Sequence, residues 1–231
     1  MSSLIEMPDL VLENIIEFSN FKAILTLRQV CRDFRNFIDD LNNSKLPDSK
    51  ITSIHVFIEK GIRFDFGKID GYFDTISYSK NPKNLRRFNG KNKTLLGNNS
   101  DILKVAFRDL ELILRFQKVQ LSWLQFNFFP SEFNSINFSM KNQKIKTEVL
   151  EISATSQPDF LSILQLTDPE NLRFFSGNQS IIEMDQLAET EQWKMAKSVT
   201  CGNFLKLNLK DIAHFSQSTI FHQSVSMEDH Y

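Results

Sequence analysis

The stretch that decides the fold of the N-terminal region is residues 1–41, which read MSSLIEMPDLVLENIIEFSNFKAILTLRQVCRDFRNFIDDL. Apolar residues recur there at helical spacing in three short blocks with almost nothing between them, which predicts three short helices. Pro8 and Asp9 mark the start of the first, because proline fits the edge of a helix and an acid favours its N-terminus. The second helix is predicted over residues 21–30 and the third over residues 32–41.

These helices carry more apolar side chains than a three-helix miniature can bury by itself. Leu12, Ile15 and Ile16 share one face of the first helix, and apolar residues extend well beyond that face. The surplus is expected to face either the rest of this chain or another protein; it comprises Leu10, Val11, Phe18, Ile24 and Leu25. The pattern alone leaves both alternatives open, although an exposed apolar patch usually marks an interaction site.

Three strings carry a family resemblance: MPDLVL at residues 7–12, Ile15-Ile16, and LTLRQVCRDF at residues 25–34. In this order they resemble an F-box, most closely that of the nematode F-box proteins that carry a C-terminal FTH domain. The match covers about residues 6–41. Met7 stands where the family usually has leucine, an exchange that conserves volume.

An F-box implies docking on a Skp-type adaptor, which links the chain to a cullin-RING ubiquitin ligase, while the rest of the chain selects a substrate protein. Arg28 and Arg32 would lie at the rim of that interface, where charge affects register and association rate. Carried over by position, the adaptor-facing or supporting residues are Pro8, Leu10, Leu12, Ile15, Ile16, Leu25, Leu27, Arg28, Val30, Cys31 and Phe34.

Composition narrows the class of protein. A net charge of −1 over 231 residues predicts no general attraction to nucleic acid or membrane. Cys31 and Cys201 lie far apart in apolar segments and are expected to be reduced thiols. No basic leader opens the chain, and no apolar run approaches the roughly 20 residues that span a bilayer. We therefore expect a cytoplasmic or nuclear protein.

Residues 42–50 are predicted to be a polar linker, and the pattern then changes to period two. Strands are predicted near residues 51–58, 62–66 and 72–78, with glycine-containing turns, as a β-meander. Residues 79–99 are interpreted as a solvated polar loop; a nucleic-acid contact or nuclear-import signal is the less favoured alternative. The loop contains six cations and no acid: Lys80, Lys83, Arg86, Arg87, Lys91 and Lys93.

From residue 101 onward, predicted helices and strands alternate. Strand centres near Leu121, Leu150, Leu172, Val199 and Ile220 are about 20 to 30 residues apart, which suits a leucine-rich-repeat-like solenoid. The Leu-x-x-Leu-x-Leu consensus itself is not preserved. Residues 184–197, with Glu191-Gln192-Trp193, followed by a strand and Ala213-His214-Phe215, resemble the FTH domain.

The predicted fold class is α+β, with three segments. They are a three-helix F-box over residues 1–45, the meander and basic loop over 46–99, and an irregular leucine-rich-repeat-like FTH domain over 100–231. FTH domains usually run longer at the C-terminus, which leaves a truncated last repeat open. A helix is also predicted over residues 130–142.

No pattern for catalysis, a cofactor or a metal is present in the sequence. The four histidines form no helical i, i+4 pair and have no cysteine beside them, and there is no nucleophile elbow, P-loop or dinucleotide fingerprint. We therefore expect a non-catalytic substrate-recognition subunit of a Skp-cullin-F-box ligase. Its partners would be the adaptor, cullin through it, and an unknown substrate. The alternatives are a solenoid interaction module without a ligase role and, third, a hydrolase.

Overall fold

The structure is a computed structural model of the chain. It describes residues 6–68, 71, 73–79, 85–88, 92–95, 101–128, 144–154, 156–178, 182–202, 204–205 and 209–221. Two compact units are present: Met1–Lys50 with Asp109–Val119, and Ile51–Arg108 with Gln120–Tyr231. None of the helices in the described residues is both long and apolar enough to span a membrane.

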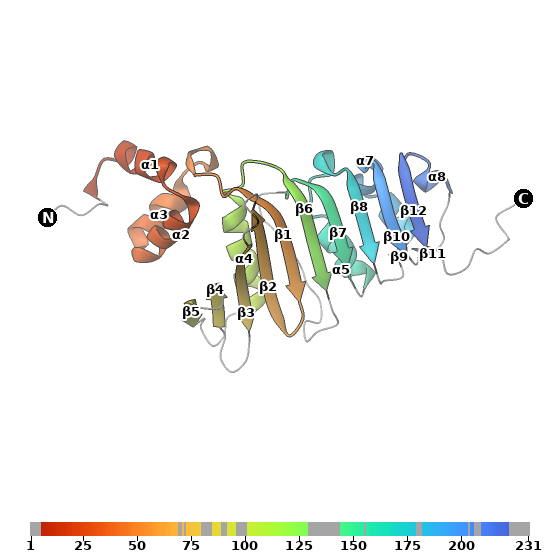
Figure 1. Cartoon of the computed structure of the whole chain (residues 1–231), viewed down its shortest axis with the longest axis horizontal. Helices are drawn as coiled ribbons and strands as arrows, with labels where there is room; N and C mark the ends of the chain where they lie inside the picture. The colour runs from red at the N-terminus through yellow and green to blue at the C-terminus, as the bar shows by residue number, and fades with distance from the viewer. Residues whose placement is uncertain are drawn as a thin grey trace, which may run out of the picture. The chain divides into compact units, whose positions relative to one another are not determined.

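The first unit contains the three predicted helices, which are confirmed: α1 (Asp9–Phe18), α2 (Phe21–Val30) and α3 (Arg32–Asp40) (Figure 1). Side chains between the helices hold their first turns. Oδ1 of Asn20 accepts the backbone N–H of Ala23 at 2.8 Å, and Sγ of Cys31 accepts that of Phe34 at 3.5 Å. Such caps satisfy N–H groups that a helix start otherwise leaves unpaired.

The core of this unit is built from one face of each helix. It consists of Leu12, Ile16, Phe21, Ile24, Phe34 and Ile38, joined by Phe116 from the second stretch of the unit. The rings of Phe21 and Phe116 are 5.8 Å apart between centroids. Ile24, one of the predicted surplus residues, is completely buried, so its side chain is not available to another protein.

Residues 42–50 are packed into the first unit, so the prediction of a polar linker is wrong. A 3₁₀ turn (Asn43–Lys45) precedes Leu46, which is buried. The backbone N–H of Ser49 donates to the carbonyl of Phe116 at 2.7 Å, and Nζ of Lys118 donates to the carbonyl of Ser44 at 2.9 Å. The sequence concealed this packing because the partners lie about 70 residues later in the chain.

The second unit is built on a ten-stranded sheet with the order β12-β10-β8-β7-β6-β1-β2-β3-β4-β5. The strands are β1 (Ile51–Ile58), β2 (Gly61–Lys68), β3 (Phe73–Ser79), β4 (Leu85–Phe88), β5 (Asn92–Leu95), β6 (Leu121–Phe128), β7 (Thr147–Ser153), β8 (Phe174–Asn178), β10 (Ser198–Gly202) and β12 (Gln217–Phe221). The predicted meander is confirmed as β1–β3. Where β4 and β5 pair antiparallel, the prediction of a loop is wrong.

Strand β1 joins the two halves of this sheet. It pairs antiparallel with β2 on one side and parallel with β6 on the other. From β1 to β12 every neighbouring pair is parallel, as in a solenoid. The meander and the repeat-like segment, treated separately at the sequence level, thus form one sheet.

Buried positions recur along the parallel strands with the spacing of the leucine-rich-repeat consensus. The triplets are Ile51, Ile54 and Val56; Leu121, Leu124 and Phe126; Thr147, Leu150 and Ile152; and Ala196, Val199 and Cys201. The consensus is therefore kept in its spacing but not in its leucines. Because apolar and small residues of suitable size can fill such a position, the pattern of buried positions shows the repeat more clearly than the residue identities do.

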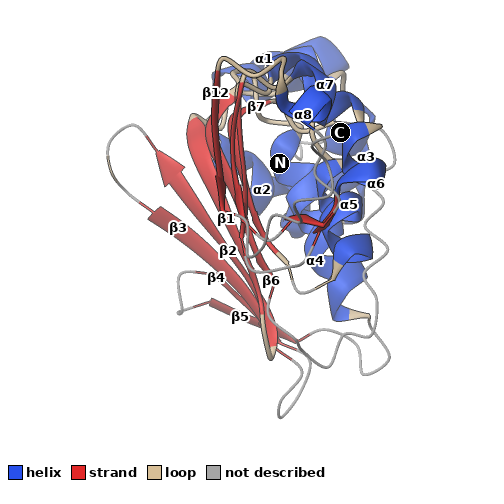
Figure 2. Ribbon diagram, turned by 90° about the vertical axis from the view of Figure 1, so that its right-hand side faces the viewer, coloured by secondary structure: helices blue, strands red, loops and turns tan. Residues whose placement is uncertain are grey.

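Helices connect the parallel strands and, in the described part of this unit, lie on one face of the sheet only (Figure 2). They are α4 (Ile102–Leu114), whose residues from Asp109 belong to the first unit, α5 (Gln157–Leu164), α6 (Met184–Ala188), α7 (Glu191–Met195) and α8 (Leu209–Ile212). A 3₁₀ turn (Pro169–Asn171) and a small two-stranded sheet, β9 (Ile182–Glu183) with β11 (Phe204–Leu205), complete the unit. The predicted helix over residues 130–142 lies outside the described residues. The observed mixture of helices and strands confirms the predicted α+β class.

Candidate functional site

An exposed apolar surface is the most distinctive feature of the first unit. Leu10 is 68% exposed, Phe18 88% and Val30 66%, and Met7 and Val11 are each about two-fifths exposed. We call the four of these residues that lie on or just before α1, namely Met7, Leu10, Val11 and Phe18, the apolar surface; Val30 is the last residue of α2. Met7, Val11 and Phe18 repeat at intervals of four and seven and so share a face.

The predicted adaptor residues divide into three groups by burial. Pro8, Leu10 and Val30 are exposed; Ile15, Leu25, Leu27, Arg28 and Cys31 are half-buried; and Leu12, Ile16 and Phe34 are buried. The buried group forms the helix core, so its members act by holding the helices together. Exposed Met7, Val11 and Phe18 were not among the predicted adaptor residues, although Val11 and Phe18 were part of the apolar surplus.

Arg28 is held inside the first unit. Its guanidinium forms two hydrogen bonds with the carboxylate of Asp39, Nε to Oδ1 at 2.6 Å and Nη2 to Oδ2 at 2.8 Å. The role predicted for Arg28 at the rim of an interface is thus joined by an internal one, the connection of α2 to α3. Arg32, at the start of α3, is exposed.

The helix-free face of the sheet is a second candidate surface. Pairing across the strands aligns Thr75, Asp65, His55, Gln125 and Glu151, which we call the polar row. Each alternates along its strand with residues whose side chains are buried, so the polar row faces away from the helices. The row thus crosses from the meander into the parallel half of the sheet.

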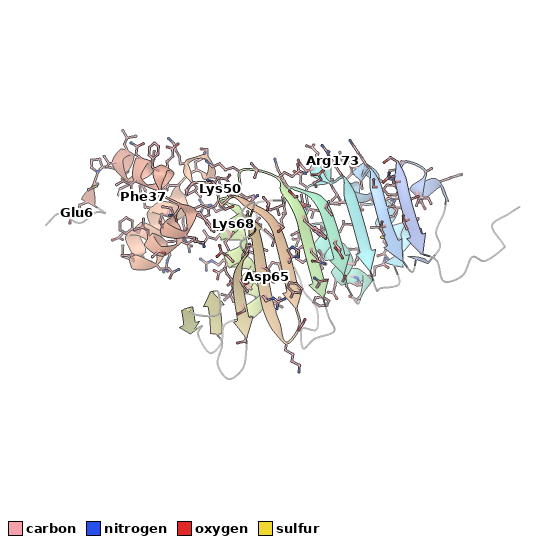
Figure 3. The ribbon with its side chains drawn as sticks, in the orientation of Figure 1. Glu6, Phe37, Lys50, Asp65, Lys68 and Arg173 are labelled. Carbon is pink, nitrogen blue, oxygen red and sulfur yellow. The ribbon has the colours of Figure 1, made fainter. Side chains whose placement is uncertain are left out.

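Two contacts fix side chains of the polar row. Oγ1 of Thr75 donates to Oδ1 of Asp65 at 2.8 Å, and Nδ1 of His55 lies 2.7 Å from Oε1 of Gln125. Because an amide oxygen only accepts, Nδ1 is the donor in this pair. Asp65, labelled with Lys68 on β2 in Figure 3, also pairs with Nε of Arg63 at 3.2 Å.

The string Glu191-Gln192-Trp193, distinctive at the sequence level, has a packing role. Nε2 of Gln192 donates to the carbonyl of Thr167 at 2.9 Å, and Nε1 of Trp193 donates to that of Asp211 at 2.8 Å. The Trp193 ring packs edge-on against Phe215, with 4.8 Å between centroids. Nε2 of His214 donates to the carbonyl of Trp193 at 3.0 Å, and so satisfies a carbonyl in the last turn of α7.

Within the described residues, no three histidine, cysteine or acidic side chains are grouped so that they could hold a metal ion. Two features face outward, namely the apolar surface of the helical unit and the helix-free face of the sheet. Both are suited to contacts with other proteins.

Comparison with known families assigns both ends of the chain. A model of the F-box domain matches residues 4–46, and a model of the FTH domain matches residues 127–231. No curated protein and no solved structure matches the chain. The F-box match covers all three N-terminal helices, and the FTH match covers the parallel strands that follow β6. The chain is an F-box protein with a C-terminal FTH domain.

Proposed function

We propose that this chain is the substrate-recognition subunit of a Skp-cullin-F-box ubiquitin ligase. One observation carries the proposal: the helices that match the F-box domain expose large apolar side chains, above all Phe18 and Leu10. A Skp-type adaptor would cover them and connect the chain to cullin. F-box proteins are generally non-catalytic adaptors, and this chain would act by holding a substrate near a ubiquitin-charged enzyme, which raises its effective concentration.

The exposed residues define the adaptor contact, and the buried ones support it. A stable interface covers about 800 Å² on each partner. Aromatic side chains are enriched in the apolar centre of such interfaces and charged side chains are depleted there. Phe18, the most exposed large apolar residue described, and Leu10 are therefore the proposed anchors. Leu12, Ile16 and Phe34 set the geometry of the helices from within.

The test is co-purification of the full chain with a Skp-type adaptor. Leu10→Asp and Phe18→Asp, singly and together, place a charge in the proposed contact and are expected to abolish the complex. The matched control is Val119→Asp, because Val119 is 51% exposed in the same unit but lies outside the F-box match. Leu12→Asp is unsuitable, since a charge in that buried site would unfold the helices.

The alternative function is a solenoid interaction module without a ligase role. The observation that favours it is the run of parallel strands from β1 to β12, an architecture used for binding extended surfaces. Wild-type protein that fails to bind any Skp-type adaptor but still binds a protein through the sheet would support this alternative. A ligase role places the chain in the cytoplasm or the nucleus, which imaging of a tagged chain would test.

A further inference from the structure

We propose that the helix-free face of the sheet binds a lysine- or arginine-bearing segment of the target protein, with the cation held between the ring of Trp123 and the carboxylate of Glu151. The inference deepens the proposed function, on which it rests only for naming the ligand as a ubiquitination target. Trp123 belongs to β6 and Glu151 to β7, both in the second unit.

Trp123 provides the aromatic half of this site. It is 43% exposed although it lies within a strand at the middle of the sheet, with β1 on one side and β7 on the other. Its ring contacts the imidazole of His55, with 6.0 Å between centroids, and His55 is in turn bound to Gln125. Tryptophan is one of the residue types enriched among the few residues that carry most of the binding energy of an interface.

Glu151 provides the anionic half. Gln125 pairs with Glu151 and Trp123 with Val149, so Glu151 is the diagonal neighbour of Trp123 on the same face. Diagonal neighbours on adjacent strands lie about 7–8 Å apart. An ammonium or guanidinium group over the indole, within about 6 Å of its centroid, is thus within reach of the carboxylate.

The charges of this face favour a cationic ligand. Among the described residues Asp65 is neutralised by Arg63 at 3.2 Å, and Glu148 by Arg173 at 3.4 Å. Glu151 forms neither an ion pair nor a hydrogen bond with any side chain in the described ranges. Glu151 therefore places a carboxylate with no cationic partner among the described side chains beside Trp123, which complements a lysine or arginine side chain and disfavours a phosphate group.

The polar row also suits a segment rather than a single side chain. Adjacent strands are about 4.8 Å apart, so the five residues from Thr75 to Glu151 extend across roughly 19 Å. A line of that length spans about five or six residues of an extended peptide. Near its meander end, Phe57, Arg63 and Ser77 line a hollow of about 190 Å³, with the Arg63 guanidinium 4.1 Å from the Phe57 ring centroid.

The test uses the full chain and fluorescein-labelled decapeptides from a positional-scanning library, with binding measured by fluorescence anisotropy. Each fixed position carries arginine, lysine, citrulline, leucine or glutamate. Wild-type protein is expected to select arginine or lysine, and citrulline in place of the selected residue is expected to weaken binding about 5-fold or more, the scale of a cation–π contact with a charge partner. Selection of glutamate or leucine, equal binding of arginine and citrulline peptides, or no binding at all would overturn the proposal.

Two variants and two controls connect the selection to the site. Trp123→Ala and the isosteric Glu151→Gln are both expected to weaken the selected peptide about 5-fold. Val119→Ala and Glu170→Gln, an exposed apolar residue and an exposed carboxylate elsewhere, are expected to leave it unchanged. Equal binding by Glu151→Gln and wild type refutes the role of the carboxylate.

Adaptor co-purification of the same variants separates the two proposals. Trp123→Ala and Glu151→Gln are expected to bind the adaptor like wild type, since neither residue belongs to the F-box. If wild-type protein does not bind the adaptor but still selects a cationic peptide, the ligase role is refuted and the cation site is supported. If it binds the adaptor but selects no cationic peptide, the ligase role is supported and the cation site is refuted.

Discussion

Arg28 in α2 and Asp39 in α3 share two hydrogen bonds between one guanidinium and one carboxylate, at 2.6 and 2.8 Å. The pair connects two helices that are joined by a single residue, Cys31. Nη1 of Arg115 lies 3.9 Å from Oδ1 of Asp39, so the carboxylate contacts two guanidinium groups. A two-point bond fixes the angle between helices better than a point charge does, because the planar guanidinium matches the carboxylate.

Arg28→Lys is therefore expected to lower the free energy of unfolding by about 1 kcal/mol, since lysine keeps the charge but cannot form the two parallel hydrogen bonds of the guanidinium. Urea denaturation of the full chain, followed by circular dichroism, measures the change. Arg32→Lys is the matched control, because Arg32 is exposed. Equal shifts in the two variants would show that the two-point geometry contributes nothing.

Leucines two residues apart in α1 are expected to differ sharply in their contribution to stability. Leu12 is 3% exposed and Leu10 is 68% exposed. Leu12→Ala leaves a cavity and is expected to cost about 3 kcal/mol, whereas Leu10→Ala is expected to cost less than about 0.5 kcal/mol. Denaturation midpoints compare the stabilities of the two variants. Co-purification then compares their adaptor binding, and Leu10→Ala is the variant expected to weaken the complex.

Gly61 occupies a position in β2 where no other residue fits. A Cβ atom there would lie 2.4 Å from the backbone oxygen of Tyr78 in β3, well inside van der Waals contact. Gly61→Ala is expected to destabilise the chain by about 2 kcal/mol, because backbone atoms cannot move aside cheaply. Thermal unfolding measures this loss, and Gly71→Ala is a comparison in which a Cβ meets no atom within 4 Å and only the positive φ is strained.

Trp193→Phe separates two contributions of one side chain. The substitution removes the hydrogen bond from Nε1 to the carbonyl of Asp211 while keeping an aromatic ring against Phe215. The expected loss of stability is about 1–2 kcal/mol, the cost of leaving a partly buried acceptor unpaired. Hydrogen exchange of the α8 amides should rise in this variant; unchanged exchange would mean that water replaces the indole without cost.

Local patterns predicted the elements whose information lies within a few residues. The start of α1 after Pro8 and the glycine at the β1–β2 turn both act through neighbouring backbone groups. β4 and β5 were missed because Leu85-Arg86-Arg87-Phe88 and Asn92-Lys93-Thr94-Leu95 are too polar to suggest strands. Their pairing partners, not their composition, make them strands.

Long-range pairing escaped the sequence altogether. Nothing in the letters of β1 indicates that His55 lies beside Gln125, 70 positions later, in a parallel ladder. The candidate adaptor site was predicted only in part. The spacing shows that the helices carry surplus apolar residues, but which of these residues are exposed depends on the packing of Phe116 and of the segment after α3. Trp123 was noticed only as a strand residue, because its exposure follows from the order of the strands.

The position of β1 has a consequence for how a protein of this kind can change its length. One edge of β1 is occupied by β2 and the other by β6, so the row of parallel strands is closed at the meander. In the described sheet, further βα units could be added or lost at β12 without disturbing the meander, since each repeat contacts only its neighbours. Relatives that differ in the number of repeats would then share the meander end of the sheet and differ in the number of strands at the β12 end.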